Sequence, residues 1–158
     1  MEVTVVVEIP KGSRNKYEYC AKEGVIKFDR MLFSSVHYPC DYGFVPDTLA
    51  ADGDALDALV VLWEPTFPGC HIETKVVGVF KMSDEKGEDE KLVCVPLNDP
   101  LWNHIESLDD LPPHLMREIE HFFLIYKDLE HKKTTVEGWF GVDEATKVIE
   151  KARKDFSK

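Results

Sequence analysis

The chain has 158 residues, of which 44% are apolar and 31% are charged, a composition typical of a folded globular protein. We therefore expect a single domain over residues 1–158, with enough chain to bury a core. The formal net charge of −11 argues against nucleic acid as a partner, because such binding depends on cationic neutralisation of phosphates.

The sequence gives three indications of location. No segment approaches the roughly 18 consecutive apolar residues of a membrane span. The opening stretch "EVTVVVEIP" lacks the basic region of a signal peptide. The four cysteines, Cys20, Cys40, Cys70 and Cys94, are widely spaced and form no CxxC pair. We therefore expect a cytoplasmic protein with reduced thiols, no membrane partner, and neither a disulfide framework nor a zinc site.

Short apolar runs between turn residues predict strands over the first two thirds of the chain. These runs cover residues 3–9, 16–20, 25–30, 58–63, 73–82 and 91–97. The second and third flank the turn-like "KEG", which predicts a hairpin. The last two are separated by "SDEKGEDE" (83–90), which we expect to be an acidic loop.

The last third of the sequence changes to helical spacing. After a pair of prolines, which suit a first helical turn, apolar side chains recur at Leu115, Ile119, Phe122, Phe123 and Tyr126. Residues 142–156 predict a second helix, whose acidic start and basic end match the helix dipole. The order of elements favours an α+β, mainly β fold, in which a small OB-type barrel precedes two helices.

The segment "DGDALDA" (52–58) holds three aspartates and no basic residue. In a regular strand or helix only two of the three would share a face, so they converge only if the chain bends, which Gly53 permits. An EF-hand is excluded because its sixth and twelfth positions would be Asp57 and Trp63. Taken alone, the segment is equally consistent with a solvated turn and with a metal site at a strand entrance.

Other charged residues favour the metal site. A second acidic cluster, in residues 83–90, adjoins another predicted strand, so both clusters can face one barrel opening. Oxygen ligands without cysteine or paired histidine favour Mg²⁺ or Mn²⁺ over zinc. Metal-bound carboxylates together with basic and phenolic donors suit a phosphoryl group. Such donors lie within predicted strands and helices, at Lys16, Arg30, Tyr38, Tyr42, Lys91, Tyr126 and Lys127.

Seven blocks of the sequence, in order, resemble the family I soluble inorganic pyrophosphatases of the Mg²⁺-dependent, prokaryotic type. The blocks are "VVVEIPKGSRNKYEY" (5–19), "DR" (29–30), "HYPCDYGFVPDTL" (37–49), "DGDALDALV" (52–60), "VGVFKMSDEKGEDEKLV" (77–93), "HFFLIYKDLE" (121–130) and "VEGW" (136–139). Ala55 stands where the family signature, D-x-D-P-x-D, usually has proline. The resemblance implies an OB-like five-stranded β-barrel with two C-terminal helices. It also implies hydrolysis of pyrophosphate to two orthophosphates by a Mg²⁺-activated water.

The resemblance also implies roles for single residues. The metal ligands would be Glu8, Glu18, Asp52, Asp57, Asp84 and Asp89, with Asp57 bridging two ions. Substrate would be bound by Lys16, Arg30, Tyr42, Lys91, Tyr126 and Lys127. The catalytic groups would be Tyr42, beside the attacking water, and Asp54 as general base, a role sometimes given to Asp89. Prokaryotic members are typically hexamers, so a homo-oligomer is expected.

Three alternatives remain open on the residues alone. OB-type barrels often bind oligonucleotides, although the net charge argues against that here. An acidic chain can also be a Ca²⁺-binding structural domain. A different metal-dependent phosphohydrolase would use the same kinds of side chain, and only its substrate would distinguish it.

Overall fold

Five strands form a closed barrel in the computed structural model, which describes residues 1–158. The strands are hydrogen-bonded in the order β1 (Glu2–Ile9), β4 (Asp41–Phe44), β5 (Asp57–Val60), β7 (Gly87–Pro96) and β6 (His71–Asp84). Pairing of β1 with β6 closes the ring. Neighbouring strands are antiparallel except β5 and β7, which are parallel. The predicted OB-like five-stranded barrel is confirmed.

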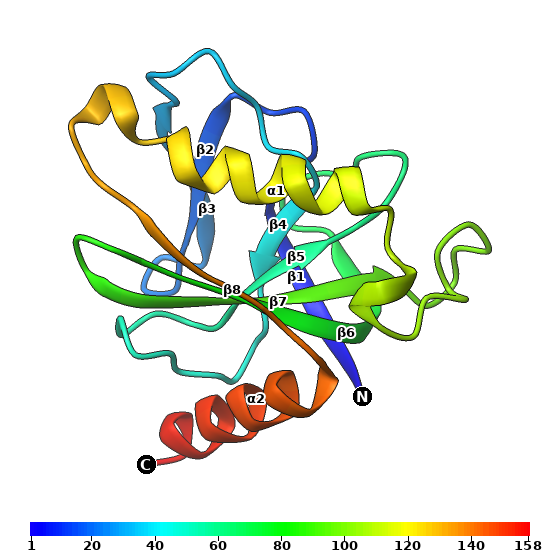
Figure 1. The fold of residues 1–158 in the computed structure, drawn as a ribbon. Helices are drawn as coiled ribbons and strands as arrows, with labels where there is room; N and C mark the ends of the chain where they lie inside the picture. The colour runs from blue at the N-terminus through cyan, green and yellow to red at the C-terminus, as the bar shows by residue number, and fades with distance from the viewer.

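Three further strands lie outside the closed ring. β2 (Asn15–Cys20) and β3 (Val25–Met31) form the predicted hairpin as a separate two-stranded sheet. In Figure 1 this hairpin lies behind the C-terminal half of α1. β8 (Thr135–Phe140) pairs with the second half of β6. The chain thus places one small sheet beside the barrel and lengthens the barrel sheet along β6.

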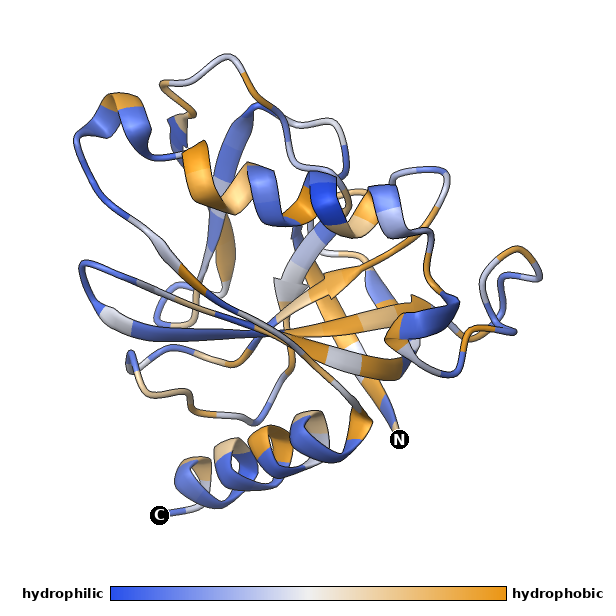
Figure 2. Ribbon diagram, viewed as in Figure 1, coloured by the Kyte–Doolittle hydropathy of each residue, from blue (hydrophilic) through white to orange (hydrophobic).

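Two helices lie on opposite sides of the barrel (Figure 1). α1 (Pro113–Ile125) buries Ile119, Phe122 and Phe123, and α2 (Val142–Phe156) buries an apolar stripe that contains Ile149. The polar outer face of α2 contrasts with its apolar inner face in Figure 2. Short 3₁₀ turns occupy Leu108–Asp110 (η1) and Asp128–Glu130 (η2). No helix in the chain has the length and apolar character needed to cross a bilayer.

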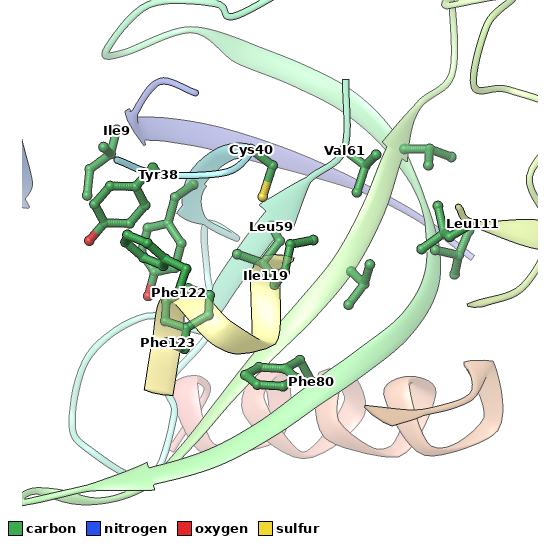
Figure 3. Close-up of a cluster of buried hydrophobic side chains, with 14 of the residues drawn as sticks. Ile9, Tyr38, Cys40, Leu59, Val61, Phe80, Leu111, Ile119, Phe122 and Phe123 are labelled. Atoms are coloured by element: carbon green, nitrogen blue, oxygen red, sulfur yellow. The ribbon is translucent and has the colours of Figure 1, made fainter. Parts of the chain in front are cut away.

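The barrel strands are apolar on both faces because a helix covers each side. Along β5, Leu59 belongs to the buried cluster beneath α1, whereas Ala58 and Val60 belong to the cluster beneath α2. This is the two-residue alternation of a strand. Figure 3 shows the first cluster, in which Phe122 and Phe123 from α1 lie near Leu59 from the barrel. The buried strand expected at residues 58–63 owes its continuous apolar run to this double cover.

The structure departs from the sequence-based expectations at several boundaries. The acidic segment 83–90 is not a loop, because β6 and β7 continue through it to a tight turn at Glu85 and Lys86. β5 ends at Val60, three residues earlier than predicted. β4 and β8 were not predicted. β4 has only four residues and contains Gly43, whose added Cβ would lie 2.0 Å from the carbonyl oxygen of Val6 on β1.

Candidate active site

A cleft of about 760 Å³ is bordered by the barrel, the β2–β3 hairpin and the C-terminal end of α1. Twelve of the thirteen residues singled out from the sequence line it, namely Glu8, Lys16, Glu18, Tyr42, Asp52, Asp54, Asp57, Asp84, Asp89, Lys91, Tyr126 and Lys127. Arg30 is not part of the wall. The two acidic clusters of the sequence therefore face one opening, although they come from different parts of the chain.

Lys91 joins two of the cleft carboxylates. Its side chain is 1% exposed, and its Nζ donates to Asp57 Oδ2 (3.2 Å), to both oxygens of Asp89 (3.0 Å each) and to the Tyr42 hydroxyl (2.7 Å). The Tyr42 hydroxyl donates to Asp57 Oδ2 (2.6 Å). Strand geometry explains the grouping: Asp57 is the partner of Lys91 in the parallel β5–β7 pair, and Asp89 precedes Lys91 by two residues on the same face of β7.

Burial dominates the electrostatics of the cleft. It raises the pKa of Asp57 to about 6 against the opposing effect of Lys91, and it raises the pKa of Glu8 to about 7. Burial also opposes the charge on Lys91, but Asp89 and then Asp57 hold its pKa above the ordinary lysine value. Carboxylates thus outnumber the cations that neutralise them in a poorly hydrated space. Such a site favours the entry of further cations.

A second ion-pair group lies where α1 ends. Lys127 Nζ donates to Asp84 Oδ2 (3.2 Å) and to Glu85 Oε1 (3.3 Å). Burial acts to raise the pKa of Asp84, but the backbone N–H of Lys86 and then Lys127 lower it overall. Burial raises the pKa of the neighbouring Tyr126 well above that of a free phenol, so its hydroxyl stays protonated as a hydrogen-bond donor.

The segment "DGDALDA" bends as its composition predicted. Gly53 adopts a φ of 90°, and the backbone N–H of Asp54 donates to Asp52 Oδ1 (3.0 Å) just before β5 begins at Asp57. All three aspartates consequently line the same cleft. Partial burial, followed by the charge of Asp52, raises the pKa of Asp54.

The β2–β3 hairpin contributes one cation, Lys16, and one acid, Glu18, to the lining of the cleft. Lys16 Nζ donates to Glu18 Oε1 (2.6 Å) and to Asp29 Oδ2 (3.2 Å). Arg30 is paired with Lys16 across the hairpin, but its guanidinium is held by Asp29 and Glu130 rather than by a residue of the cleft. Arg30 is therefore the one predicted site residue that does not line the cleft, although it lies next to Lys16, which does.

The oxygen donors of the cleft suit a hard divalent cation. Six carboxylates expected to bind metal line it, and no cysteine does. No three acidic, histidine or cysteine side chains stand at metal-ligand spacing. Lys91 and Lys127 are instead paired with three of the carboxylates, Asp57, Asp89 and Asp84. The donor chemistry fits Mg²⁺ or Mn²⁺, which would have to compete with these two ammonium groups.

Some residues of the cleft region carried no assigned role in the sequence. Tyr38, which the sequence offered as a candidate donor but to which the family resemblance gave no role, is buried against Phe122, with ring centroids 4.7 Å apart, and lines the cleft. Asp29 and Glu130 hold Arg30. Both acids lie inside blocks that resemble the family, but no spacing rule pairs residues 100 positions apart, so their shared contact could not be predicted.

Comparison with known proteins identifies the family. Residues 5–157 match the family described as inorganic pyrophosphatase. The inorganic pyrophosphatase of Methanosarcina acetivorans is 61% identical over 153 residues, covering 97% of this chain and 91% of the relative. That of Streptomyces coelicolor is 53% identical over 158 residues, covering 99% and 96%. The solved structure of the Helicobacter pylori inorganic pyrophosphatase superposes with a TM-score of 0.97 at 42% identity, covering 99% of this chain and 94% of that one. The Thermus thermophilus structure gives 0.96 at 42% identity, covering 99% and 92%. The chain belongs to the inorganic pyrophosphatase family.

Proposed function

We propose that the cleft is the active site in which this chain hydrolyses inorganic pyrophosphate to two orthophosphates with the help of Mg²⁺. Family membership makes the chain a hydrolase and favours this reaction over oligonucleotide binding, a structural Ca²⁺ domain or another phosphohydrolase. The observation that carries the proposal is the cleft itself, in which carboxylates, lysines and phenols from distant segments surround one space.

The carboxylates would hold the metal ions. Asp52, Asp57, Asp84 and Asp89 are the proposed principal ligands, and Glu8 and Glu18 would serve further ions. Bound Mg²⁺, or Mn²⁺ in its place, would polarise the phosphoryl oxygens and lower the pKa of the attacking water. The raised pKa values of Asp57 and Glu8 support this role, because a cation relieves the cost of burying their charge.

A carboxylate must accept the proton of the attacking water. We assign this to Asp54, whose raised pKa moves it toward the range useful for a general base. Asp89 is the alternative, but both of its oxygens already accept hydrogen bonds from Lys91. Tyr42 contacts Asp57 and Lys91 and would orient the water. The water oxygen bonds to one phosphorus as the bridging P–O bond breaks, and the second phosphate leaves.

The cationic and phenolic groups would bind the substrate oxygens. Lys16, Arg30, Lys91, Tyr126 and Lys127 are the proposed donors. Lys91 and Lys127 are neutralised by cleft carboxylates in this structure. Once divalent cations neutralise those carboxylates, the two ammonium groups become available to a phosphate, which explains how an acidic cleft takes a polyanion.

Phosphate release tests the proposed function. Wild-type protein is incubated with Mg²⁺ and either pyrophosphate, ATP or p-nitrophenyl phosphate, with and without excess EDTA. We expect release from pyrophosphate far above release from the other two compounds, and loss of that activity with EDTA. Preference for a nucleotide or an ester would assign the site to another phosphohydrolase, and full activity in EDTA would rule out the metal-dependent reaction.

We further propose that the chain forms one domain and works in the cytoplasm as a homo-oligomer, with a hexamer as the expected form. The four free thiols are compatible with a reducing compartment. Large apolar side chains on the surface, such as Trp63 at 69% exposed, support self-association. Sedimentation velocity should show a species of six times the chain mass, and a monomer at micromolar concentration would contradict the hexamer.

A further inference from the structure

A buried carboxylate, Glu130, holds the guanidinium of Arg30 beside the cleft-lining Lys16. Arg30 Nη2 donates to Glu130 Oε2 (3.1 Å) and lies 3.0 Å from Glu130 Oε1. The side chain of Glu130 is only 6% exposed, and Arg30 is the cation that contacts it. On the other side, Arg30 Nη1 donates to Asp29 Oδ2 (2.5 Å). Two acids therefore set the orientation of one arginine.

The contact between Arg30 and Glu130 joins two walls of the cleft. Glu130 ends η2, the turn that directly follows Tyr126 and Lys127. Arg30 lies on β3, where it is paired with Lys16 on β2. The proposed phosphate-binding groups come from both sides of this contact: Lys16 and Arg30 from the hairpin, and Tyr126 and Lys127 from the end of α1.

The other contacts that fix the hairpin lie along β2 and just after β3. It forms its own two-stranded sheet and adds no strand to the barrel ladder. The backbone N–H of Tyr19 donates to Glu8 Oε2 (2.7 Å), and the Tyr19 ring stacks on Phe44 with centroids 5.1 Å apart. Both contacts lie near the end of β2 that is remote from Arg30. At the Arg30 end of the hairpin, buried Leu32 packs in the core beneath α1 and the Ser34 hydroxyl donates to the Ile125 carbonyl (3.5 Å). The pair with Glu130 adds a charged contact there, and it is the one that also fixes the Arg30 guanidinium.

The geometry leaves Arg30 with hydrogen-bond capacity to spare. A guanidinium carries five N–H groups in a rigid plane, so fixing two of them fixes the direction of the others. Asp29 takes one N–H from Nη1, and Glu130 takes one from Nη2. One N–H on each terminal nitrogen remains, which suits two-point contact with a phosphate.

We infer that Glu130 is a positioning residue for the reaction. It orients Arg30 and fixes the hairpin against the turn that carries Tyr126 and Lys127, so that donors from the two walls keep the separation that pyrophosphate requires. Glu130 does not touch the substrate itself. This inference rests on the proposed function, because it concerns the same cleft and the same substrate.

The first test is Glu130→Gln, which keeps the side-chain shape but removes the charge. We expect kcat/KM for pyrophosphate to fall about 10- to 100-fold, the effect of misplacing a binding group by roughly 1 Å. The affinity for methylenediphosphonate, which keeps two phosphorus groups but cannot be hydrolysed, should weaken in parallel. The matched control is Glu118→Gln, because Glu118 lies exposed on α1 and pairs only with His114. This control should behave as wild type.

A double-mutant cycle separates positioning from general support of the fold. If Glu130 acts through Arg30, adding Glu130→Gln to Arg30→Met, which removes the charge that pairs with Glu130, should cost no more than about twofold beyond Arg30→Met alone. Losses that multiply would overturn the inference. If circular dichroism shows that Glu130→Gln does not fold, the same measurements are made on Glu130→Asp. This variant keeps the charge, but its shorter side chain places the carboxylate farther from Arg30.

Different results would contradict the positioning role of Glu130 and the proposed function of the cleft. An active wild type together with a fully active Glu130→Gln variant would overturn the positioning role alone. A wild type that releases no phosphate from pyrophosphate would contradict the proposed function, and the inference would fall with it.

Discussion

Lys91→Met removes the buried cation that joins Asp57 and Asp89 while keeping most of the side-chain volume. The native ammonium is 1% exposed and contacts both carboxylates at 3.0–3.2 Å as well as the Tyr42 hydroxyl at 2.7 Å. Removing one partner of a buried ion pair costs about 3–5 kcal/mol, because the remaining charge loses its compensation. In metal-free buffer we therefore expect Lys91→Met to lower the free energy of unfolding by about 3–5 kcal/mol.

Divalent cations should reverse most of this loss. If Asp57 and Asp89 are metal ligands, Mg²⁺ supplies the positive charge that Lys91→Met takes away. For a chain of this length, 1 kcal/mol shifts the melting temperature by about 2–4 °C. We expect Lys91→Met to melt roughly 10 °C below wild type in EDTA. With saturating Mg²⁺, the difference between the two melting temperatures should be less than half as large.

The assay is thermal unfolding at a fixed protein concentration. The pH is kept well above the pKa of Asp57, which is about 6, so that its carboxylate is charged. The control is Lys151→Met. Lys151 is 72% exposed and pairs with Asp155 at 2.8 Å, so its loss should leave the melting temperature nearly unchanged with or without metal. An equal lowering of the melting temperature by Lys91→Met in EDTA and in Mg²⁺ would contradict this expectation, because it would mean that no cation enters beside these carboxylates.

Two further predictions concern the scaffold around Tyr42. Buried Asp41 accepts hydrogen bonds from the backbone N–H groups of Lys11 (2.8 Å) and Thr66 (3.1 Å) and from the Thr66 hydroxyl (2.5 Å). Asp41→Asn should lower the free energy of unfolding in urea by about 2 kcal/mol, since an amide presents only one acceptor oxygen, and an unchanged midpoint would contradict this. Gly43→Ala should prevent β1 and β4 from pairing, because the added Cβ would lie 2.0 Å from the Val6 carbonyl oxygen, and a variant with a wild-type unfolding midpoint would show that the strands can separate without cost.

The parts of the fold that depend on local patterns could be predicted from the sequence. The second helix was predicted at residues 142–156, the bounds that α2 has, because its charges and apolar spacing agree. The prediction of a loop at residues 83–90 was wrong, although a run of charged residues usually indicates a loop. Here it forms the outer part of a long hairpin in which Lys81 is paired with Glu90 across the strands.

The composition of the candidate site could also be predicted, but not its internal contacts. The bend at Gly53 and the two acidic clusters followed from residue types alone. The joining of Asp57 to Lys91 depends on the parallel register of β5 and β7, which no local pattern specifies. Arg30 was expected among the substrate-binding groups, yet its position is set by Glu130, 100 residues away along the chain. Contacts of this range are fixed by the closed barrel and by the packing of α1.

In the proposed function, particular carboxylates of this cleft, and not merely its overall acidity, serve pyrophosphate hydrolysis. Two aspartates of the same cleft provide a matched comparison: Asp57, the proposed bridging ligand, and Asp47, an exposed residue with no assigned role. Asp47 has a φ of 59°, which asparagine tolerates well, so Asp47→Asn should fold normally. The decisive measurement is kcat for phosphate release from pyrophosphate with saturating Mg²⁺. We expect kcat to fall about 100-fold or more in Asp57→Asn and to change by less than about twofold in Asp47→Asn. Near-normal turnover by Asp57→Asn, or equal losses in the two variants, would contradict it.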